Sequence, residues 1–360
     1  MNFKSNIPKS IEDKIGLNHH NQKGHPIKII KEKIYKYFDT LENEKFDKFD
    51  NFNPFVSIVD NFDLLRIPKD HPARKLTDTY YKDFEIVLRT HTTAHQNQLF
   101  SKGYKNFLVT GDVYRKDEID SRHFPMFYQT DGVFLINDKE NPEQELKKRL
   151  ANLIDYLFPG KEYRFNEDYF PFTDPSFEME VKFDNKWLEI LGCGLIHQEI
   201  LDKYGIQGKY AAFGLGISRL AMILFNIPDI RYLYETDARF LDQFEDEQIK
   251  EFKPYPKLKA ISKDISFWIN EKEIKKIECD FDWLNINNFY EIIRNICGNN
   301  IKEVIILDKF FHKTQNKYSL TFRLLIESLE EKDPGMLNSI ANNILNNLKD
   351  ALSSLNYDIR

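Results

Sequence analysis

The sequence predicts an α+β protein with a large antiparallel-sheet domain followed by a smaller second module. Strand-like runs separated by turn residues dominate residues 55–225, and the few helical stretches among them are clearest at 142–157 and 217–226. Residues 237–256 are charged and run into KPYPK, which is typical of a linker. Beyond them, strand-like and helical segments follow in the order βαββαβ, that of a ferredoxin-like module of about 100 residues.

The N-terminal region combines a polar stretch with an amphipathic helix. Residues 1–24 are mostly polar, so we expect them to be loosely held. After them, Ile27, Ile30, Ile34 and Phe38 recur at helical spacing. This period predicts one helix with a single buried face.

Five runs predict the strands of the large sheet. They are NFLVTGDVY, FYQTDGVFLI, FEMEVKF, WLEILGCG and YAAFGLG. Because turn residues separate them and helices between them are few, they favour antiparallel pairing.

The second module has a clear order of elements. KAISKDISFWI predicts a strand, INNFYEIIRNIC a helix, and EVIILDKF and YSLTFRLLIES two further strands. PGMLNSIANNILNNLKDALSSL predicts a long helix with proline near its start, and NYDIR a last strand.

The composition fits a globular protein. The 360 residues are 41% hydrophobic and 30% charged, and no apolar run is long enough to cross a bilayer. The formal net charge of -6 excludes a uniformly basic nucleic-acid coat, so any contact with RNA must use a local basic patch.

Cysteine usage argues against a zinc site. Cys193, Cys279 and Cys297 form no C-x-x-C pair, and so sparse a set suits a reducing compartment. The N-terminus lacks an apolar core and contains Glu12 and Asp13, so we expect neither a secretory signal nor a transit peptide there.

The first segment with chemical potential is RTHTTAHQ. His91, Thr93 and Gln96 are donors that suit the carboxylate and amino groups of a ligand. The structural alternative is a helix start, with Thr92 or Thr93 as its N-cap.

The second segment, GDVYRKDEIDSRHFPMFYQTDGVFLI, predicts a strand, a charged loop and a strand. Period-two geometry puts Gln129 and Asp131 on one face, where they suit an ammonium group. Arg115 suits a phosphate, because its planar fork makes bidentate contacts. The alternative is an exposed hairpin decorated with salt bridges.

The third segment is YFPFTDPSFEMEV with the following WLEILGCGL. Phe170 and Phe172 flank a proline and suit an aromatic ligand, although core packing is the alternative. Glu189 lies in an apolar strand, where a carboxylate is costly unless paired, so it is a candidate for a metal ion or an ATP hydroxyl. Gly192 and Gly194 would let a flat ligand approach the backbone.

The fourth segment, YAAFGLGISRLAMILF, predicts a strand of small residues that leads into a helix. Arg219 falls in the first turn, where its guanidinium and the helix N-terminus both favour phosphate. Close packing of strand on helix is the alternative.

Together these segments resemble the motifs of one enzyme class. The surroundings of Arg115 resemble motif 2 of class II aminoacyl-tRNA synthetases, and GLGISR, ending at Arg219, resembles motif 3. KYFDTLENEKFDKFDNFNPF resembles a degenerate motif 1. Six sequence segments resemble the phenylalanyl-tRNA synthetase family in particular: DNFDLLRIPKDHPAR, THTTAHQ, GDVYRKDEIDSRHFP, YFPFTDPSFEMEV, WLEILGCG and AFGLGISRLAMILFNIPDIR.

The resemblance runs from Asn18 to the end of the chain, and the C-terminal module resembles the family's anticodon-binding domain. It implies a phenylalanine–tRNA ligase that makes phenylalanyl-adenylate from L-phenylalanine and ATP, with Mg²⁺, and transfers the acyl group to tRNA(Phe). Catalytic core and anticodon module share one chain, as in the single-chain organellar form. That form implies a monomer of the mitochondrial matrix, or of a plastid, with no membrane association and no editing domain.

The same resemblance assigns roles to positions. Arg115 and Arg219 would be the catalytic arginines, on the α- and γ-phosphates of ATP. The ATP site would also include Arg122, His123, Phe127 and Glu189, and Glu189 would hold the metal ion. The amino-acid site would comprise His91, Thr93, Ala94, His95, Gln96, Tyr128, Gln129, Thr130, Asp131, Phe170, Phe172, Ala212 and Phe213.

Three positions depart from the family pattern. Asp131 replaces a glutamate, Thr93 stands where serine is common, and Ser218 precedes Arg219 where glutamate is usual. Both phosphate-binding arginines remain, so we expect an active enzyme.

Two other functions fit parts of the pattern. A non-catalytic tRNA-binding paralogue is disfavoured by the presence of both arginines, and another class II-like ligase by the anticodon-like module. We expect an N-terminal extension at 1–20, a catalytic domain at 21–236, a linker at 237–256 and an anticodon-binding domain at 257–360.

Overall fold

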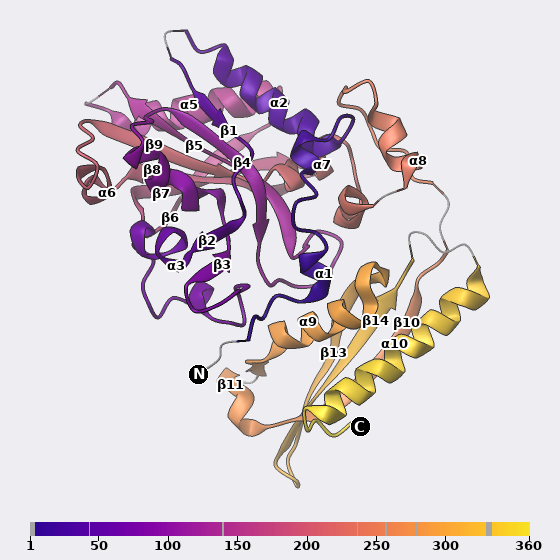
Figure 1. Ribbon diagram of the computed structural model, residues 1–360. Coiled ribbons are helices and arrows are strands. Elements are labelled where there is room, and N and C mark those ends of the chain that lie inside the picture. Colours follow the sequence, from indigo (N-terminus) through magenta and orange to yellow (C-terminus); the bar gives the residue numbers. More distant parts are fainter. Residues whose placement is uncertain are drawn as a thin grey trace.

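The structure is a computed structural model that describes residues 4–42, 44–138, 140–235, 237–255, 258–277, 280–328 and 333–360. Figure 1 shows a large N-terminal part above a smaller C-terminal part. Cys279 lies outside the described residues, as do residues 1–3 of the expected extension and the end of the KPYPK segment.

A seven-stranded sheet forms the centre of the N-terminal part (Figure 1). Its order is β1-β4-β5-β9-β8-β7-β6, with β1 at Asp47–Phe49, β4 at Phe107–Tyr114, β5 at Met126–Ile136, β6 at Tyr163–Asp168, β7 at Thr173–Phe183, β8 at Lys186–Ile196 and β9 at Lys209–Leu215. All five predicted runs are strands, and β4 to β9 pair antiparallel as predicted. The short β1 joins β4 in parallel.

The two faces of this sheet differ. Leu108 and Phe134 face a core built with α2 (Pro26–Asp39), α5 (Pro142–Leu157) and α7 (Ile217–Leu224). Phe107, Val109 and Val133 alternate with them and pack on the other face, near α4 (Gln96–Ser101) and α6 (Gln198–Asp202). This alternation is the period of two that a strand imposes, and it leaves the second face to build a site.

Short elements complete the N-terminal part. They are α1 (Lys9–Glu12), β2 (Phe55–Ser57), which pairs with β3 (Ile86–Leu88), α3 (Ile58–Asn61), α8 (Ala238–Leu241) and several 3-10 turns, including η1 (His19–Asn21) and η4 (Thr92–His95). The expectation that residues 1–24 are loosely held is wrong for the described ones. Ile11, His19 and His20 are buried, because α1 and η1 pack on the rest of the chain.

The C-terminal part confirms the predicted βαββα order. A three-stranded sheet β10-β14-β13 comprises Ile261–Ile269, Lys317–Ile326 and Ile301–His312, and it packs with α9 (Ile286–Cys297) and α10 (Pro334–Ser354). A hairpin of β11 (Ile274–Ile277) and β12 (Asp280–Trp283) precedes α9. The terminal NYDIR forms only one bridge, between Ile359 and Phe267, instead of the predicted strand.

The segment expected as a linker is partly packed. Phe240, Phe244 and Phe252 are buried in the N-terminal core, so the described residues at 237–255 cover that core. Conversely, Ile119 of the N-terminal part belongs to the C-terminal core. Among the described helices, none is both long and apolar enough to cross a bilayer.

Candidate active site

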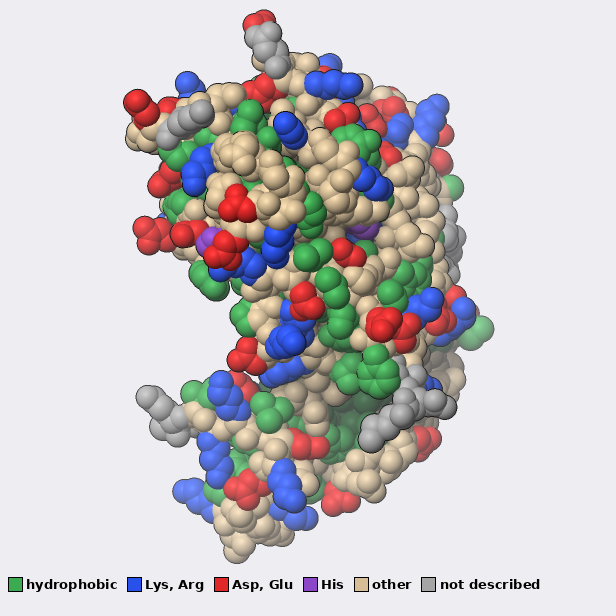
Figure 2. Space-filling view, turned by 60° about the vertical axis from the view of Figure 1, so that its left-hand side comes forward, with side chains coloured by type: hydrophobic (Ala, Val, Ile, Leu, Met, Phe, Trp, Pro, Cys, Tyr) green, Lys and Arg blue, Asp and Glu red, His purple; other side chains and the backbone are tan. Residues whose placement is uncertain are grey.

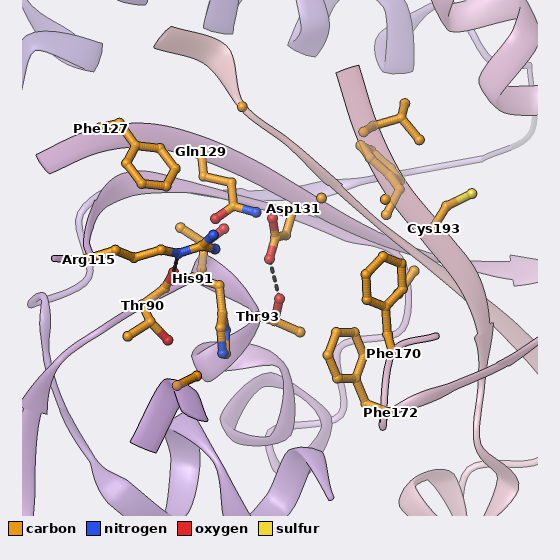
Figure 3. A pocket seen from close by; sticks show the side chains of 18 of the residues that line it. Thr90, His91, Thr93, Arg115, Phe127, Gln129, Asp131, Phe170, Phe172 and Cys193 are labelled. Atoms are coloured by element: carbon orange, nitrogen blue, oxygen red, sulfur yellow. Dashed lines mark hydrogen bonds between the residues drawn. The ribbon is translucent and has the colours of Figure 1, made fainter. Parts of the chain in front are cut away.

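A cavity of about 650 Å³ lies on the sheet face opposite α2 (Figure 3). Its floor comes from Gln129, Asp131, Ala212 and Gly214, side by side on β5 and β9. Its walls come from the segment around His91, from the loop after β4 and from the turn before β7. Segments far apart in the sequence therefore meet at one site.

One end of the cavity is lined by polar groups that lack partners. The Thr93 hydroxyl donates to the Asp131 carboxylate. The amide group of Gln96 and the carbonyl oxygen of Gln129 are buried without a hydrogen-bond partner in the described part of the chain. Buried polar groups are normally paired, so these atoms are available to form hydrogen bonds with a polar ligand. The structural alternative for this segment had Thr92 or Thr93 as an N-cap. Instead, the Thr93 hydroxyl bonds to Asp131, and His91 is the N-cap residue of η4.

Burial raises the pKa of Asp131 to about 6, although the hydrogen bond from Thr93 and the charge of Arg115 oppose the shift. Because this pKa lies near neutral pH, both the protonated and the ionised carboxyl are populated there. A ligand ammonium group beside it would favour the ionised form, because opposite charges attract strongly away from water.

The other end is basic. Arg115 follows β4, its Nε donates to the Thr90 carbonyl over 2.7 Å, and its guanidinium lies 5.2 Å from the centre of the Phe127 ring. Arg219 is in the first turn of α7, and its Nη1 donates to the Glu189 carbonyl over 3.1 Å. Both arginines line the same cavity.

Glu189 differs from its expected setting. Its side chain is 57% exposed and lies 4.0 Å from Arg219 Nη1. The apolar strand around it predicts a buried carboxylate, but the strand turns this side chain toward the open cavity. Its position there suits contact with a charged ligand.

Two aromatic rings form a slot beside the polar end (Figure 3). The ring centres of Phe170 and Phe172 are 6.0 Å apart, and the rings are inclined by 17°. A Cβ atom at Gly192 would lie 2.7 Å from the Phe170 ring, and one at Gly194 would lie 2.5 Å from the Pro175 carbonyl. These glycines therefore make room for protein atoms, and Gly192 also lines the cavity, so the approach of a flat ligand to the backbone there stays a prediction.

The loop after β4 closes the basic end. Arg122 and His123 line the cavity there. His123 Nδ1 lies 2.8 Å from Asp120 Oδ2, and this hydrogen bond raises the pKa of His123. Burial alone would raise the pKa of Asp120, but bonds from His123 and from backbone N–H groups hold it at about 2.

Four residues expected in the amino-acid site lie outside the lining among the described residues: Ala94, His95, Tyr128 and Thr130. Tyr128 and Thr130 point to the opposite sheet face, where the Tyr128 hydroxyl accepts from the backbone N–H of His19. His95 stacks on Phe52 with ring centres 4.4 Å apart. We do not propose these four as substrate contacts.

Phe213 is a partial case. It contributes to the lining, but its ring stacks on Phe38 of α2, with centres 5.6 Å apart, on the other face of the sheet. Sequence reasoning also missed the Thr90 carbonyl, which orients Arg115, and Gly214, whose missing side chain leaves space for Gln129 and Asp131. The alternation of small residues in YAAFGLG was the only available signal for Gly214.

Comparisons with known proteins identify the family to which the chain belongs. The model of the class II core domain (F) of tRNA synthetases matches residues 12–244. With its antiparallel sheet and its two cavity arginines, the chain is thus a class II aminoacyl-tRNA synthetase by fold.

The relatives define the family more closely. The chain is 41% identical to the chloroplastic/mitochondrial phenylalanine–tRNA ligase of Arabidopsis thaliana, over 99% of this chain and 83% of that protein. It is 38% identical to the mitochondrial enzyme of Dictyostelium discoideum, over 90% and 83%, and 31% identical to that of Saccharomyces cerevisiae, over 97% and 90%. The chain belongs to the phenylalanine–tRNA ligase family, which confirms the resemblance found in the sequence.

Proposed function

We propose that this member of the family binds L-phenylalanine and ATP together in the described cavity, forms phenylalanyl-adenylate there and transfers the phenylalanyl group to tRNA(Phe). One observation supports this most strongly. Two guanidinium groups, unpaired buried amide atoms and an aromatic slot line a single cavity, although they come from distant segments. That set matches the charges and shape of an aromatic amino acid beside a triphosphate.

The amino acid would lie across the sheet floor. Its ammonium group would meet Asp131 and Gln129, and its ring would enter the slot beside Phe170 and Phe172. Edge-to-face contacts with two rings favour an aromatic ligand over an aliphatic one of similar volume. Thr93 keeps Asp131 oriented through its hydroxyl.

The nucleotide would occupy the basic end. Phe127 would stack on adenine with one face of its ring, while the Arg115 guanidinium lies 5.2 Å from the centre of that ring. Arg115 would hold the α-phosphate and Arg219 the γ-phosphate, with Arg122 and His123 closing over the nucleotide. When the carboxylate of phenylalanine attacks the α-phosphorus and diphosphate leaves, negative charge develops between these preset cations.

A magnesium ion fits this end in a limited way. Glu189 offers one exposed carboxylate next to the proposed phosphate position. Mg²⁺ in nucleotide sites commonly takes only one or two protein carboxylates, with phosphate oxygens and water completing its shell. When bound, it would supply further charge neutralisation of the phosphates.

The acceptor would be tRNA(Phe), with residues 21–236 as catalytic domain and 257–360 as anticodon-binding domain. Figure 2 shows a notch between the upper and lower parts of the molecule, where Lys and Arg side chains lie among Asp and Glu side chains. Because the net charge is -6, contact with the RNA backbone would have to use such local cations. The relatives named as mitochondrial make the mitochondrion the proposed compartment, with a plastid as the alternative, and a single chain suggests a monomer.

The test is amino-acid-dependent exchange of label between diphosphate and ATP, screened over all amino acids. We expect exchange with phenylalanine and roughly a hundredth of that efficiency with tyrosine, since an apolar pocket rejects an added hydroxyl weakly. Arg115→Ala should lower the exchange rate by roughly a hundredfold or more.

Arg323→Ala is the matched control, because Arg323 pairs with Asp264 on the C-terminal sheet. Exchange that Arg115→Ala leaves intact, or exchange with a different amino acid, would contradict the proposal. Absence of exchange in the parent protein would support the non-catalytic paralogue.

A further inference from the structure

We propose that Arg294 of the C-terminal module is a positioning residue for the ATP site. It holds the loop between β4 and β5, residues 115–125, in the conformation that receives the nucleotide. The inference rests on the proposed function, and it makes the C-terminal module a structural component of amino-acid activation, a step that precedes any contact with tRNA.

The loop is held through three successive backbone carbonyls. Arg294 Nη2 donates to the carbonyl of Asp117 and, over 2.8 Å, to that of Glu118. The next carbonyl, of Ile119, accepts from the backbone N–H of Val304 at 2.9 Å. All three hydrogen bonds are donated by the C-terminal module, so that module fixes the loop backbone next to Arg115.

The side chain of Ile119 adds an apolar anchor. Only 6% of this residue is exposed, and it belongs to the core of the C-terminal module. Burying one aliphatic side chain stabilises such a contact substantially. The loop is thus attached to the module by hydrogen bonds and by packing together.

Arg294 is itself held rigidly. Its Nη1 pairs with Glu291, and both residues are 7% exposed. The other Glu291 oxygen accepts from the hydroxyl of Tyr80, a fully buried residue of the N-terminal part, over 2.8 Å. A buried charge pair is costly unless every group finds a partner, and here the partners lie on both sides of the junction.

The contacts lie close to the residues proposed for ATP. Arg115 precedes the first held carbonyl by two positions, and Arg122 and His123 follow the last by three and four. A loop without these contacts would have to become ordered when ATP binds, and that ordering weakens affinity. The proposed phenylalanine contacts are on β5, near His91 and in the turn at Phe170, so they do not depend on this loop.

The experiment uses the full chain and diphosphate exchange without tRNA. We expect Arg294→Ala to raise the KM for ATP about tenfold while the KM for phenylalanine stays within about twofold. Arg294→Lys should give an intermediate value, because one ammonium group cannot reproduce the planar fork that reaches two carbonyls and a carboxylate. Arg323→Ala, in the same module, should leave both constants unchanged.

Two measurements keep the result interpretable if Arg294→Ala is poorly folded. Thermal unfolding followed by circular dichroism identifies such a loss. Tyr80→Phe removes only the hydroxyl that fixes Glu291, and we expect a smaller rise, about threefold, in the KM for ATP and none in the KM for phenylalanine.

A folded Arg294→Ala variant with an unchanged KM for ATP, or with equal rises for both substrates, overturns the proposal. A parent protein without phenylalanine-dependent exchange overturns the proposed function instead, so the two failures are distinguishable.

Discussion

Gly214 lies where β9 passes closest to the polar end of the cavity. A Cβ atom there would be 2.9 Å from Gln129 Nε2 and 3.0 Å from Asp131 Oδ1. We expect Gly214→Ala to displace both groups and to raise the KM for phenylalanine by about tenfold, with little change for ATP. Diphosphate exchange at varied substrate concentrations measures this difference.

Gly216→Ala is the matched control two residues later. The nearest atom to a Cβ there, within the described part of the chain, is Arg219 Cβ at 4.0 Å, an ordinary contact. An equal effect of both substitutions would show that an added methyl group disturbs the site at either position, and would remove the case for a specific role of Gly214.

Asp131 predicts a pH dependence of phenylalanine binding. Its pKa in the empty site is about 6, so the carboxyl is mostly protonated at pH 5 and mostly ionised at pH 7. Only the ionised form attracts an ammonium group, and the affinity for phenylalanine should therefore rise about tenfold between these pH values. Calorimetric titration with phenylalanine measures it, and Asp131→Asn should abolish the slope.

The raised pKa of Asp131 has the opposite effect on folding stability, which falls as pH rises. The folded pKa lies above the ordinary value of 3.8, so this contribution is present below pH 3.8 and is lost as pH rises through about 6. A pH profile of binding that is equally steep in Asp131→Asn would mean that another group titrates.

Single residues show how far the sequence could predict the site. Period-two alternation put Gln129 and Asp131 on one face, and the structure has both in the cavity. The same alternation should have removed Tyr128 and Thr130, which only the family resemblance had placed there. His95 was beyond sequence reasoning, because its partner Arg89 is fixed by Asp112 on a separate strand.

At the scale of elements, His25 connects the start of α2 to the rest of the fold. Its Nδ1 accepts from the backbone N–H of Ile27 over 3.1 Å, and its Nε2 donates to the Leu233 carbonyl over 3.0 Å. Its ring stacks on His19 with centres 4.5 Å apart. Burial, with a smaller effect of the neighbouring His19, lowers the pKa of His25 to about 3.

We expect His25→Ala to lower the free energy of unfolding by about 1–2 kcal/mol through loss of the cap. Because the folded pKa is far below 6.5, the stability that neutral His25 contributes is present above pH 6.5 and is lost as pH falls toward about 3. The parent should thus lose about 2 kcal/mol more than the variant between pH 6.5 and 5 in urea unfolding.

His71 offers the matched control. It caps η3 (Pro72–Arg74) with the same kind of bond, Nδ1 to the Ala73 N–H at 3.2 Å, but it is exposed. His71→Ala should change stability by under about 1 kcal/mol at every pH tested. If the free energy of unfolding changes with pH equally in the parent and in His25→Ala, buried neutral His25 is not the source of the pH dependence.

Elements with a strong period were predictable, and short ones were not. The spacing of Ile27, Ile30 and Ile34 indicated α2 because a buried stripe repeats over its length. The three-residue β1 has no such repeat. The polarity of the N-terminal residues predicts a loosely held segment, yet His19 and His20 are buried against residues such as Tyr128. Composition does not reveal such tertiary contacts.

At the scale of the whole molecule, Arg231 ties the two parts together. It is 5% exposed and pairs with the carboxylates of Asp229 and Glu327, each at 2.8 Å. Its Nη1 also donates to the carbonyls of Asn299, Ile301 and Glu327 over 3.2 Å. The acceptors belong to both parts, so the parts should unfold cooperatively.

We expect Arg231→Ala to destabilise the protein by about 3–5 kcal/mol, since it leaves Asp229 buried without its cation. Calorimetry should show one main transition in the parent and two in the variant, because the Arg231 contacts, which join the two parts, are lost. Arg239→Ala removes a 41% exposed partner of Asp237 and should cost at most about 1 kcal/mol. A single transition in Arg231→Ala, shifted no more than in that control, would contradict this role.

Ile119 has a consequence for how such chains can be recombined. Ile119 belongs to the loop between β4 and β5, but its side chain packs in the hydrophobic core of the C-terminal part. Consider a hybrid whose N-terminal part comes from one relative and whose last hundred or so residues come from another. In such a hybrid, the side chain at position 119 would have to fit the C-terminal core, in addition to the correct folding of each part. We therefore expect such a hybrid to fold well only when the loop that carries Ile119 and the C-terminal core come from the same relative.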